Sequence, residues 1–354
     1  MKVKILIILI ALIGLGAGGF FVWKNISAPE TEKTEEEIYI YKGVWLPGIN
    51  PNYLASHMQK MTDLGMNTVY LAVMSIQEEG NPLAGLETSH IVEDIQLAHQ
   101  NGMKVMLTLQ IYPKPRLGEK DLEALNSKII EVAKIAEEYD VELFAPLAEV
   151  DTIISGDVKK WRREILPKVK KVYHGELFWS SPGAGPSLPD KTIISQIAKQ
   201  PAGDFAGYDY IGFPFLFPVS ERLEPEERIQ FADMLTLEKY SQYVEGALDY
   251  MLALAERDNC KGVIIQEFGV GERFFMSGSD VVDMLDTGWL SEEELARALE
   301  IVFEKGKDKS VGFIVANPLG GEVPSLPGLP KIYIEGVSET EEEVIRRYFT
   351  EILD

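Results

Sequence analysis

Short apolar segments recur along most of the chain, separated by longer stretches in which apolar and polar positions mix. Eight of these segments are rich in β-branched or aromatic residues and are mostly apolar without a polar position at every second residue, a pattern typical of strands buried on both faces of a parallel sheet. The predicted strands are residues 40–46, 68–74, 104–110, 142–147, 176–179, 210–217, 263–266 and 311–316.

Helical periodicity lies between most of these segments, at residues 53–64, 90–100, 122–139 and 158–172. Two further helices are predicted to start at capping boxes, which are formed by Ser291 with Glu294 and by Ser338 with Glu341. Eight strands that alternate with helices predict an α/β protein with a (β/α)8 TIM barrel. A doubly wound open sheet is the alternative, but it usually carries a glycine-rich phosphate turn after its first strand. This chain instead has Trp45-Leu46-Pro47-Gly48 there.

The chain begins with a different pattern. Residues 5–22 are eighteen consecutive apolar or glycine residues, preceded by Lys2 and Lys4. This run is just long enough to cross a membrane, and the preceding lysines favour placing everything after it outside the cell. We therefore expect a transmembrane anchor or signal at residues 1–24, a polar linker at 25–37 and a barrel domain at 38–354. The expected location is the cell membrane with the barrel outside; if the segment is a cleaved signal, the protein is secreted.

Charge and composition limit the classes of partner and cofactor that the protein is expected to bind. The chain has a net charge of −22, and residues 1–37 contribute only four lysines against five acidic residues, so the barrel itself is acidic. This argues against nucleic acid as a partner and admits neutral ligands such as sugars. The single cysteine, Cys260, excludes an intramolecular disulfide, and the four histidines are scattered. We expect no metal site and no cofactor.

Two glutamates follow apolar strands at corresponding places. Glu149 comes after the fourth predicted strand and Glu267 after the seventh, so in a barrel both reach the carboxyl-terminal end, where active sites are built. The longest connections also follow strand ends, at residues 182–199, 218–235, 271–290 and 317–330. A pair of carboxylates across a cleft is what cleavage of a glycosidic bond requires.

These residues resemble the large clan of retaining (β/α)8 glycoside hydrolases whose catalytic glutamates end strands 4 and 7. The resemblance is nearest to the endo-β-mannanase-like branch and spans about residues 38–316. The motifs that carry it are Lys42-Gly43-Val44-Trp45, Leu64-Gly65-Met66-Asn67-Thr68-Val69, Val141-Glu142-Leu143-Phe144, Tyr208-Asp209-Tyr210-Ile211-Gly212 and Ile264-Ile265-Gln266-Glu267-Phe268-Gly269.

The resemblance implies that Glu149 is the general acid/base and Glu267 the nucleophile of an extracellular enzyme that cleaves a β-linked polysaccharide or oligosaccharide. The chain departs from the clan's pattern at Ala148, where the clan usually has Asn. It departs again near the ends of strands 6 and 8, where a Tyr and a Trp are missing. A carbohydrate-binding surface barrel with weak or no catalysis, such as a lectin or scaffold, is therefore the alternative.

Several other side chains at strand ends or in the following loops are expected to bind the sugar by stacking or hydrogen bonding. Phe215 has a similar place, but packing in the core explains it better, and Gln110 is a further candidate partner for a hydroxyl group. The predicted substrate-binding residues are Trp45, Tyr112, Trp179, Trp289 and Asn317.

Overall fold

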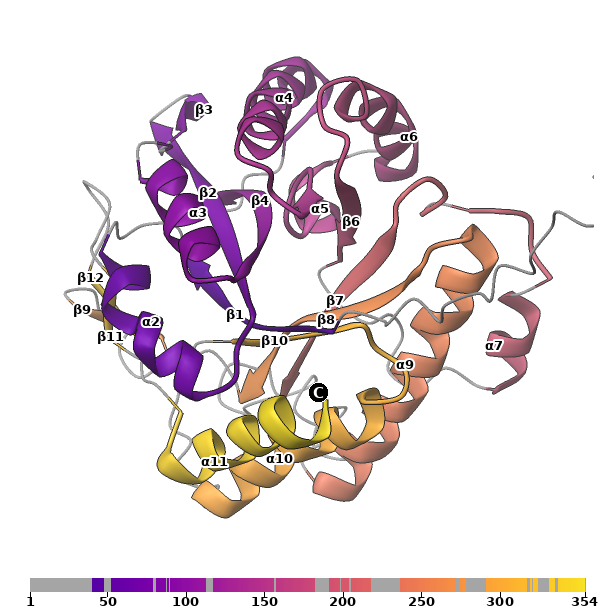
Figure 1. The fold of residues 1–354 in the computed structure, drawn as a ribbon. Coiled ribbons are helices and arrows are strands. Elements are labelled where there is room, and N and C mark those ends of the chain that lie inside the picture. The colour runs from indigo at the N-terminus through magenta and orange to yellow at the C-terminus, as the bar shows by residue number, and fades with distance from the viewer. Residues whose placement is uncertain are drawn as a thin grey trace, which may run out of the picture. The chain divides into compact units, whose positions relative to one another are not determined.

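Eight parallel strands close into a barrel (Figure 1). They are β1 (Tyr41–Pro47), β2 (Thr68–Glu78), β4 (Lys104–Tyr112), β5 (Leu143–Ala145), β6 (Glu176–Ser180), β7 (Tyr210–Phe217), β8 (Gly262–Val270) and β10 (Gly312–Ala316). Each coincides with a strand expected from the sequence. Strand β1 pairs with both β10 and β2, which closes the ring and leaves none of the eight strands at an open edge.

The computed structural model describes residues 40–47, 52–78, 81–86, 88, 90–112, 117–155, 157–181, 191–197, 199–203, 205–217, 236–270, 274–277, 291–316, 319, 321–323, 331–334 and 337–353. The predicted anchor and linker, residues 1–24 and 25–37, lie outside these ranges. Inside them, no helix has both the length and the apolar content needed to cross a bilayer.

Helices follow the strands and cover the outside of the barrel (Figure 1). The longer ones are α2 (Tyr53–Asp63), α3 (Ile91–Gln100), α4 (Leu122–Glu138), α6 (Val158–Val169), α7 (Lys191–Ile197), α9 (Leu237–Asp258), α10 (Glu292–Gly306) and α11 (Glu339–Arg347). The shorter ones are η1 (Glu119–Asp121), α5 (Val150–Ile153) and η3 (Tyr348–Ile352). Both predicted capping boxes are present, at the starts of α10 and α11. The helix periodicity and capping signals in the sequence therefore identified real helices.

The strands carry apolar side chains on both faces, which explains why the sequence shows no alternation along them. One face forms a small core inside the barrel, and the other packs beneath the helices. The inner core consists of Tyr41, Tyr70, Met106, Leu143, Ala145, Phe178, Tyr210, Ile264 and Ile314. The outer core is much larger and includes Phe268 of β8 and Phe303 of α10, whose ring centroids lie 5.0 Å apart.

At the amino-terminal end of the barrel, polar side chains pair with one another. We call Tyr41, Glu176, Asp209, Tyr210 and Lys261 the floor. Lys261 Nζ lies 2.6 Å from Glu176 Oε1 and 3.1 Å from Asp209 Oδ1. The Tyr41 hydroxyl donates to Glu176 Oε2 at 3.0 Å, and the Tyr210 hydroxyl donates to Glu176 Oε1 at 3.4 Å. Burial, followed by the charge of Glu176, raises the pKa of Tyr210 to about 12, so this phenol stays neutral and can donate.

The opposite end carries strands that the sequence did not predict. Strand β3 (Asn81–Leu86) adds to the barrel sheet antiparallel to β2. A separate antiparallel sheet has the order β11 (Gly321–Val323), β12 (Lys331–Ile334) and β9 (Phe274–Ser277). Strands β9 and β11 lie within the long connections after β8 and β10. These connections therefore meet in a sheet that joins two neighbouring sectors of the barrel rim.

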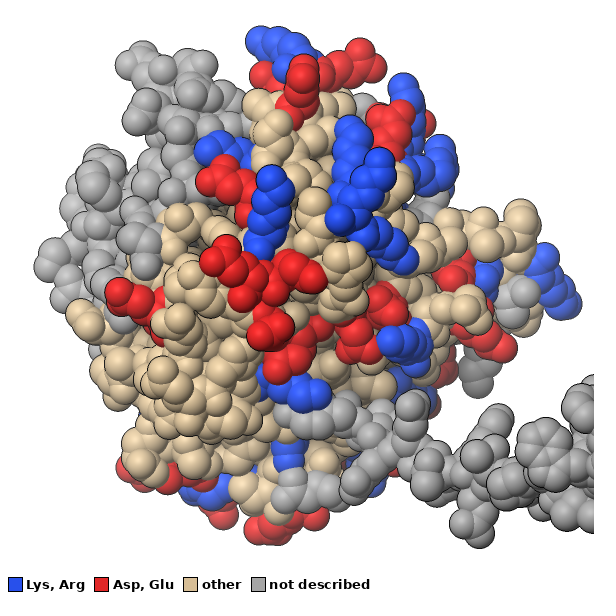
Figure 2. All heavy atoms as spheres, turned by 45° about the horizontal axis from the view of Figure 1, so that its top comes forward, with Lys and Arg blue, Asp and Glu red and all other residues tan. Residues whose placement is uncertain are grey.

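Charge is unevenly distributed over the outside. Helix α6 and the turn after it expose basic residues on an otherwise acidic protein, namely Lys159, Lys160, Arg163, Lys168, Lys170 and Lys171. Figure 2 brings the top of Figure 1 forward and shows lysines and arginines close to acidic side chains on that face. The acidic excess is therefore not one continuous surface there.

Candidate active site

The carboxyl-terminal ends of the strands form the mouth of the barrel. Trp45, near the end of β1, is partly exposed and packs against the inner core, and its contact with substrate stays a prediction. Tyr112 ends β4, which brings its backbone to the same level, but its side chain lies outside the described part of the structure. Trp289 and Asn317 also lie outside the described residues. Their predicted contacts with substrate stay predictions.

Strand β8 contains an extra residue beside Glu267. Along β7, Phe213 pairs with Ile265 and the next residue, Pro214, pairs with Glu267, so Gln266 has no counterpart. The pairing of β8 with β10 shifts by one residue in the same place. This irregularity is a β-bulge, a feature that re-aims side chains and is common next to active sites. The sequence placed the end of the strand at Gln266, whereas β8 continues through the bulge to Val270.

The bulge changes the face on which Glu267 lies. Ile265 and Phe268 both belong to the outer core, although they are three positions apart. Strict alternation would put Glu267 on the outside with Ile265. With the extra residue, Gln266 and Glu267 both lie on the inner side, between two outward-facing neighbours. Glu267 is therefore delivered to the mouth by a backbone irregularity rather than by regular strand geometry.

The backbone at Glu149 has a different irregularity, a left-handed conformation. It lies beyond the end of β5, and the preceding residue, Ala148, donates its N–H to the carbonyl of Leu109 at 2.8 Å. Glu149 itself adopts the left-handed conformation, with φ of 49° and ψ of 43°. Among the described non-glycine residues this conformation recurs at Asp140 and Asn259, short Asx residues that follow helix ends and tolerate it better. For a long side chain it costs about 1–2 kcal/mol, and such strain clusters at functional sites.

The charges of both carboxylates act on the buried hydroxyl of Tyr70. This side chain lies in the inner core and is 2% exposed. Burial raises its pKa, the nearby hydroxyl groups of Ser180 and Thr108 lower it, and the charges of Glu267 and Glu149 raise it further. Both glutamates therefore lie near enough to Tyr70 for their charges to act on its hydroxyl. Their catalytic roles stay a prediction.

Two amide side chains present unused acceptors at this end. The Oε1 atoms of Gln110, on β4, and Gln266 are buried and have no hydrogen-bond partner in the part of the chain that the structure describes. The amide nitrogen of Gln266 is used, since Nε2 donates to the Ser181 carbonyl at 2.9 Å. A buried acceptor without a donor is costly unless water or a ligand supplies one. Hydroxyl groups of a neutral ligand are donors of this kind.

The prediction that Trp179 lines the substrate site is wrong. Its side chain is 1% exposed and belongs to the outer core. The guanidinium of Arg162, on α6, lies 3.8 Å from the centre of its ring, and the rings of Trp161 and Tyr208 make edge contacts with it. The physical reason is strand alternation: Phe178 faces the inside of the barrel, so Trp179 must face the helices.

One further expectation is confirmed, and three residues of the mouth were not expected from the sequence. Phe215 is 1% exposed and contacts Tyr243 of α9, which confirms its expected place in the core. The sequence reasoning missed Tyr70, Gln266 and Gly212 as parts of the mouth. A signal was available for Gln266, because a lone amide in an apolar strand beside a glutamate needs a hydrogen-bond partner.

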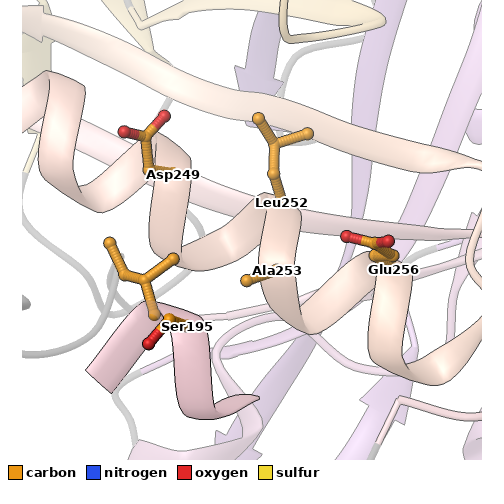
Figure 3. A pocket seen from close by; sticks show the side chains of 6 residues that line it. Ser195, Asp249, Leu252, Ala253 and Glu256 are labelled. Carbon is orange, nitrogen blue, oxygen red and sulfur yellow. The ribbon is translucent and has the colours of Figure 1, made fainter. Parts of the chain in front are cut away.

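A surface hollow lies outside the barrel, between α7 and α9. It is lined by Ile194, Ser195, Asp249, Leu252, Ala253 and Glu256. Figure 3 shows most of these side chains along α9, with Ser195 on the facing turn of α7. One of its two carboxylates, Asp249, is paired with Lys309 at 2.6 Å. This hollow shares no residue with the mouth.

Comparisons with known proteins bear on the fold. No family model matches the sequence, and no curated protein matches it either. Solved structures do match. A GH113 beta-1,4-mannanase in a complex structure superposes with a TM-score of 0.57 at 16% identity, covering 88% of this chain and 99% of that chain.

Two further mannanases are similar at this level. The GH113 beta-mannanase from Alicyclobacillus acidocaldarius, in complex with ManMIm, gives a TM-score of 0.56 at 15% identity, with 89% of this chain and 98% of that chain covered. The endo-1,4-beta-mannanase from Rhizomucor miehei gives 0.55 at 11% identity, with coverages of 89% and 95%. At such low identity the likeness concerns the fold. The expectation drawn from the sequence resemblance is confirmed at that level: the chain has a (β/α)8 barrel like those of glycoside hydrolases related to the GH113 mannanases.

Proposed function

We propose that the protein is a retaining glycoside hydrolase that acts outside the cell on a β-linked polysaccharide or oligosaccharide. The observation that carries this proposal is the place of the two glutamates: Glu149 lies beyond the carboxyl-terminal end of β5 on a left-handed residue, and Glu267 lies in the bulge of β8. The charges of both carboxylates act on the buried hydroxyl of Tyr70, which supports a shared site. The unused acceptors of Gln110 and Gln266 suit hydroxyl groups of a neutral ligand.

The chemistry follows from two carboxyl groups on opposite sides of a glycosidic bond. Glu149 protonates the departing oxygen while the carboxylate of Glu267 attacks the anomeric carbon, which gives a glycosyl-enzyme and a free leaving group. Glu149, now ionised, takes a proton from water, and the oxygen of that water displaces Glu267 from the sugar. Two displacements retain the β configuration, and this mechanism requires the carboxyl groups to be about 5–5.5 Å apart.

The solved structures with a similar fold suggest which substrate class to test first. Several are named as beta-1,4-mannanases or endo-1,4-beta-mannanases, so β-1,4-mannan is the first substrate to test. Trp45 offers a partly exposed aromatic face on which a sugar ring can stack. Tyr112, Trp289 and Asn317 are proposed to complete the contacts, on the basis of their positions in the sequence.

The decisive experiment uses the barrel from residue 38 onward against mannan, cellulose, xylan and related β-glucans. Released reducing ends report turnover, and proton NMR of the first product reports its configuration. Turnover with the β-anomer formed first is the expected result. First formation of the α-anomer would contradict double displacement, and an absence of turnover on all substrates would contradict the enzyme assignment for that panel.

A second candidate function is a carbohydrate-binding barrel with weak or no catalysis. Ala148 favours it, because this side chain is 6% exposed and apolar at the position before Glu149, where the clan usually has Asn. A methyl group cannot hydrogen-bond a sugar hydroxyl, and each lost transition-state hydrogen bond costs about 3–4 kcal/mol in mutational precedents. Ligand-induced thermal stabilisation without turnover would favour this alternative, whereas turnover that Ala148→Asn raises would favour the enzyme.

We also infer from the sequence that residues 5–22 anchor the protein in the cell membrane with the barrel outside. The apolar run and its flanking lysines support this location. Expression with and without residues 1–24, followed by membrane fractionation and protease protection, tests it. Recovery of the full chain in the soluble cell fraction would contradict both the anchor and the secreted alternative.

A further inference from the structure

The bulge in β8 needs a support that regular strand pairing does not provide. Gln266 is the residue skipped in the pairing with β7, and its side chain is 3% exposed. Its Nε2 donates to the carbonyl of Ser181, just beyond the end of β6. Ser181 in turn donates its N–H to the carbonyl of Gly212 on β7, at 2.9 Å. These two hydrogen bonds link the bulge to the end of β6, and the end of β6 in turn to β7.

Gly212 provides the space for this link. A β-carbon at this position would lie 2.5 Å from Gln266 Oε1, 3.1 Å from Phe178 Cδ2 and 3.3 Å from the carbonyl oxygen of Trp179. The first distance is too short for any real contact. Because Gly212 has no side chain, the amide of Gln266 can pass along the inner face of β7 and reach β6. The bulge and the glycine are therefore complementary features of adjacent strands.

We propose that Gln266 is the positioning residue of Glu267: anchored to Ser181 across Gly212, it fixes the bulge and thereby the direction in which the Glu267 carboxylate enters the mouth. Glu267 is the next residue on the same bulge, so the peptide plane that it shares with Gln266 sets its Cα–Cβ direction. This inference rests on the proposed role of Glu267 as the nucleophile.

The reaction tolerates little displacement of its nucleophile, so the support of the bulge affects the rate. A nucleophile must lie about 3–3.5 Å from the carbon that it attacks, and a displacement of 1 Å can cost about 10²-fold in rate. Loss of the amide removes the hydrogen bond that ties the bulge to Ser181. The carboxylate of Glu267 then spends less time in the productive position, which lowers kcat more than it changes KM.

Gln266→Met tests the link, because methionine has nearly the same length and shape and lacks the amide. The expected result is a fall in kcat of about 10–100-fold with KM changed by less than about threefold. Ile265→Val is the matched control: this neighbour faces the outer core, is fully buried, and loses one methyl group. It should lower the melting temperature and leave kcat within about twofold, because its defect is one of packing alone. Equal kcat values for the two variants would overturn the proposal.

A double-mutant cycle isolates the contact with Gly212. Gly212→Ala should lower kcat in the wild-type background, because the new methyl group collides with Gln266 Oε1. In the Gln266→Ala background the same substitution should have a smaller effect, since the colliding atom is gone and only the contacts with Phe178 and Trp179 remain. Additive effects on kcat would contradict a Gln266 link that passes over Gly212.

Crystal structures of wild type and Gln266→Met keep this inference separate from the proposed function. If no tested glycan is hydrolysed by the wild type, the enzyme assignment fails, but the positions of Glu267 still decide the inference. A carboxylate displaced by about 1 Å or more in Gln266→Met supports positioning. An unchanged bulge and an unchanged carboxylate would overturn it, whatever the activity of the wild type.

Discussion

The two ends of the barrel handle polar groups in opposite ways. On the floor, Glu176 and Asp209 share Lys261, and two phenols donate to Glu176. In the mouth, Glu149 and Glu267 both raise the pKa of Tyr70, and the Oε1 atoms of Gln110 and Gln266 have no partner among the described residues. The floor is thus complete within the chain, whereas the mouth holds acceptors that await a donor.

The backbone geometry also differs between the floor and the mouth. The floor glutamate begins a regular strand, while the mouth glutamates depend on a left-handed residue and a bulge. Paired groups on regular strands stabilise a fold. Strained backbone and unused acceptors cost stability and are retained where they serve a site. The carboxylates of the mouth are therefore the ones to test for chemistry, and those of the floor are the ones to test for stability.

The largest expected effects are those of the mouth glutamates, beginning with Glu149→Gln. Removal of the general acid/base should lower kcat/KM by about 10²–10⁴-fold on a polysaccharide, whose leaving group needs a proton. Aryl glycosides with acidic phenols need little protonation, so the first step on them should be much less affected. Steady-state kinetics on both substrate types provide the measurement. Equal losses on both would contradict the assignment of Glu149 as the acid.

Next in size is Glu176→Gln on the floor. The neutral amide removes the charge that Lys261 faces at 2.6 Å and weakens the hydrogen bonds from two phenols. Stability should fall by about 1–3 kcal/mol, the usual range for charged hydrogen bonds, while kcat of the folded protein stays unchanged. Urea unfolding and kinetics on the same preparation measure both quantities. A loss of kcat at full stability would show that the two ends are not separated in function.

A buried carboxyl group that lies at neither end of the barrel tests the same idea, namely that burying an unneutralised charge is costly. Burial raises the pKa of Asp94 to about 7, an effect that His90 opposes and Glu93 reinforces. Its ordinary value is about 3.9, so between about pH 4 and pH 7 the unfolded chain loses this proton while the folded protein keeps it. This group therefore makes stability fall as pH rises through that window.

Asp94→Asn removes this dependence. Urea unfolding at pH 5 and pH 8 should show that the variant gains stability relative to wild type at the higher pH. A stability difference that is the same at both pH values would mean that Asp94 titrates normally in the folded state.

The smallest effect is expected on the exposed surface. Glu245 lies 2.7 Å from Lys305 on the outer helices, and the two side chains are 50% and 32% exposed. Glu245→Gln should change the free energy of unfolding by less than about 1 kcal/mol, because exposed ion pairs contribute little, and should leave kcat unchanged. It serves as the carboxylate-to-amide control for the mouth and the floor. A larger effect than that of Glu176→Gln would break the distinction between paired groups inside the barrel and solvated pairs outside.

The sequence predicted the architecture well because strands buried on both faces appear as short apolar segments, and helices show a period of 3.6 residues. All eight barrel strands and both capping boxes were found in this way. Side-chain direction was harder, because a strand buried on both faces shows no alternation. For that reason Trp179 was assigned to the mouth although it packs under α6. The bulge at Gln266 escaped notice because it depends on how three strands pair, and this is not written in any one of them.

The most direct test of the account is Glu267→Gln, measured beside Glu176→Gln for both turnover and melting temperature. Glu267→Gln is expected to reduce hydrolysis of the best substrate by at least about 10³-fold, the scale of a lost catalytic group. Its melting temperature should stay unchanged or rise, since a charge kept for function is relieved. Glu176→Gln should show the reverse pattern. Activity that survives in Glu267→Gln on that same substrate would contradict the central claim that the mouth glutamates carry out the reaction.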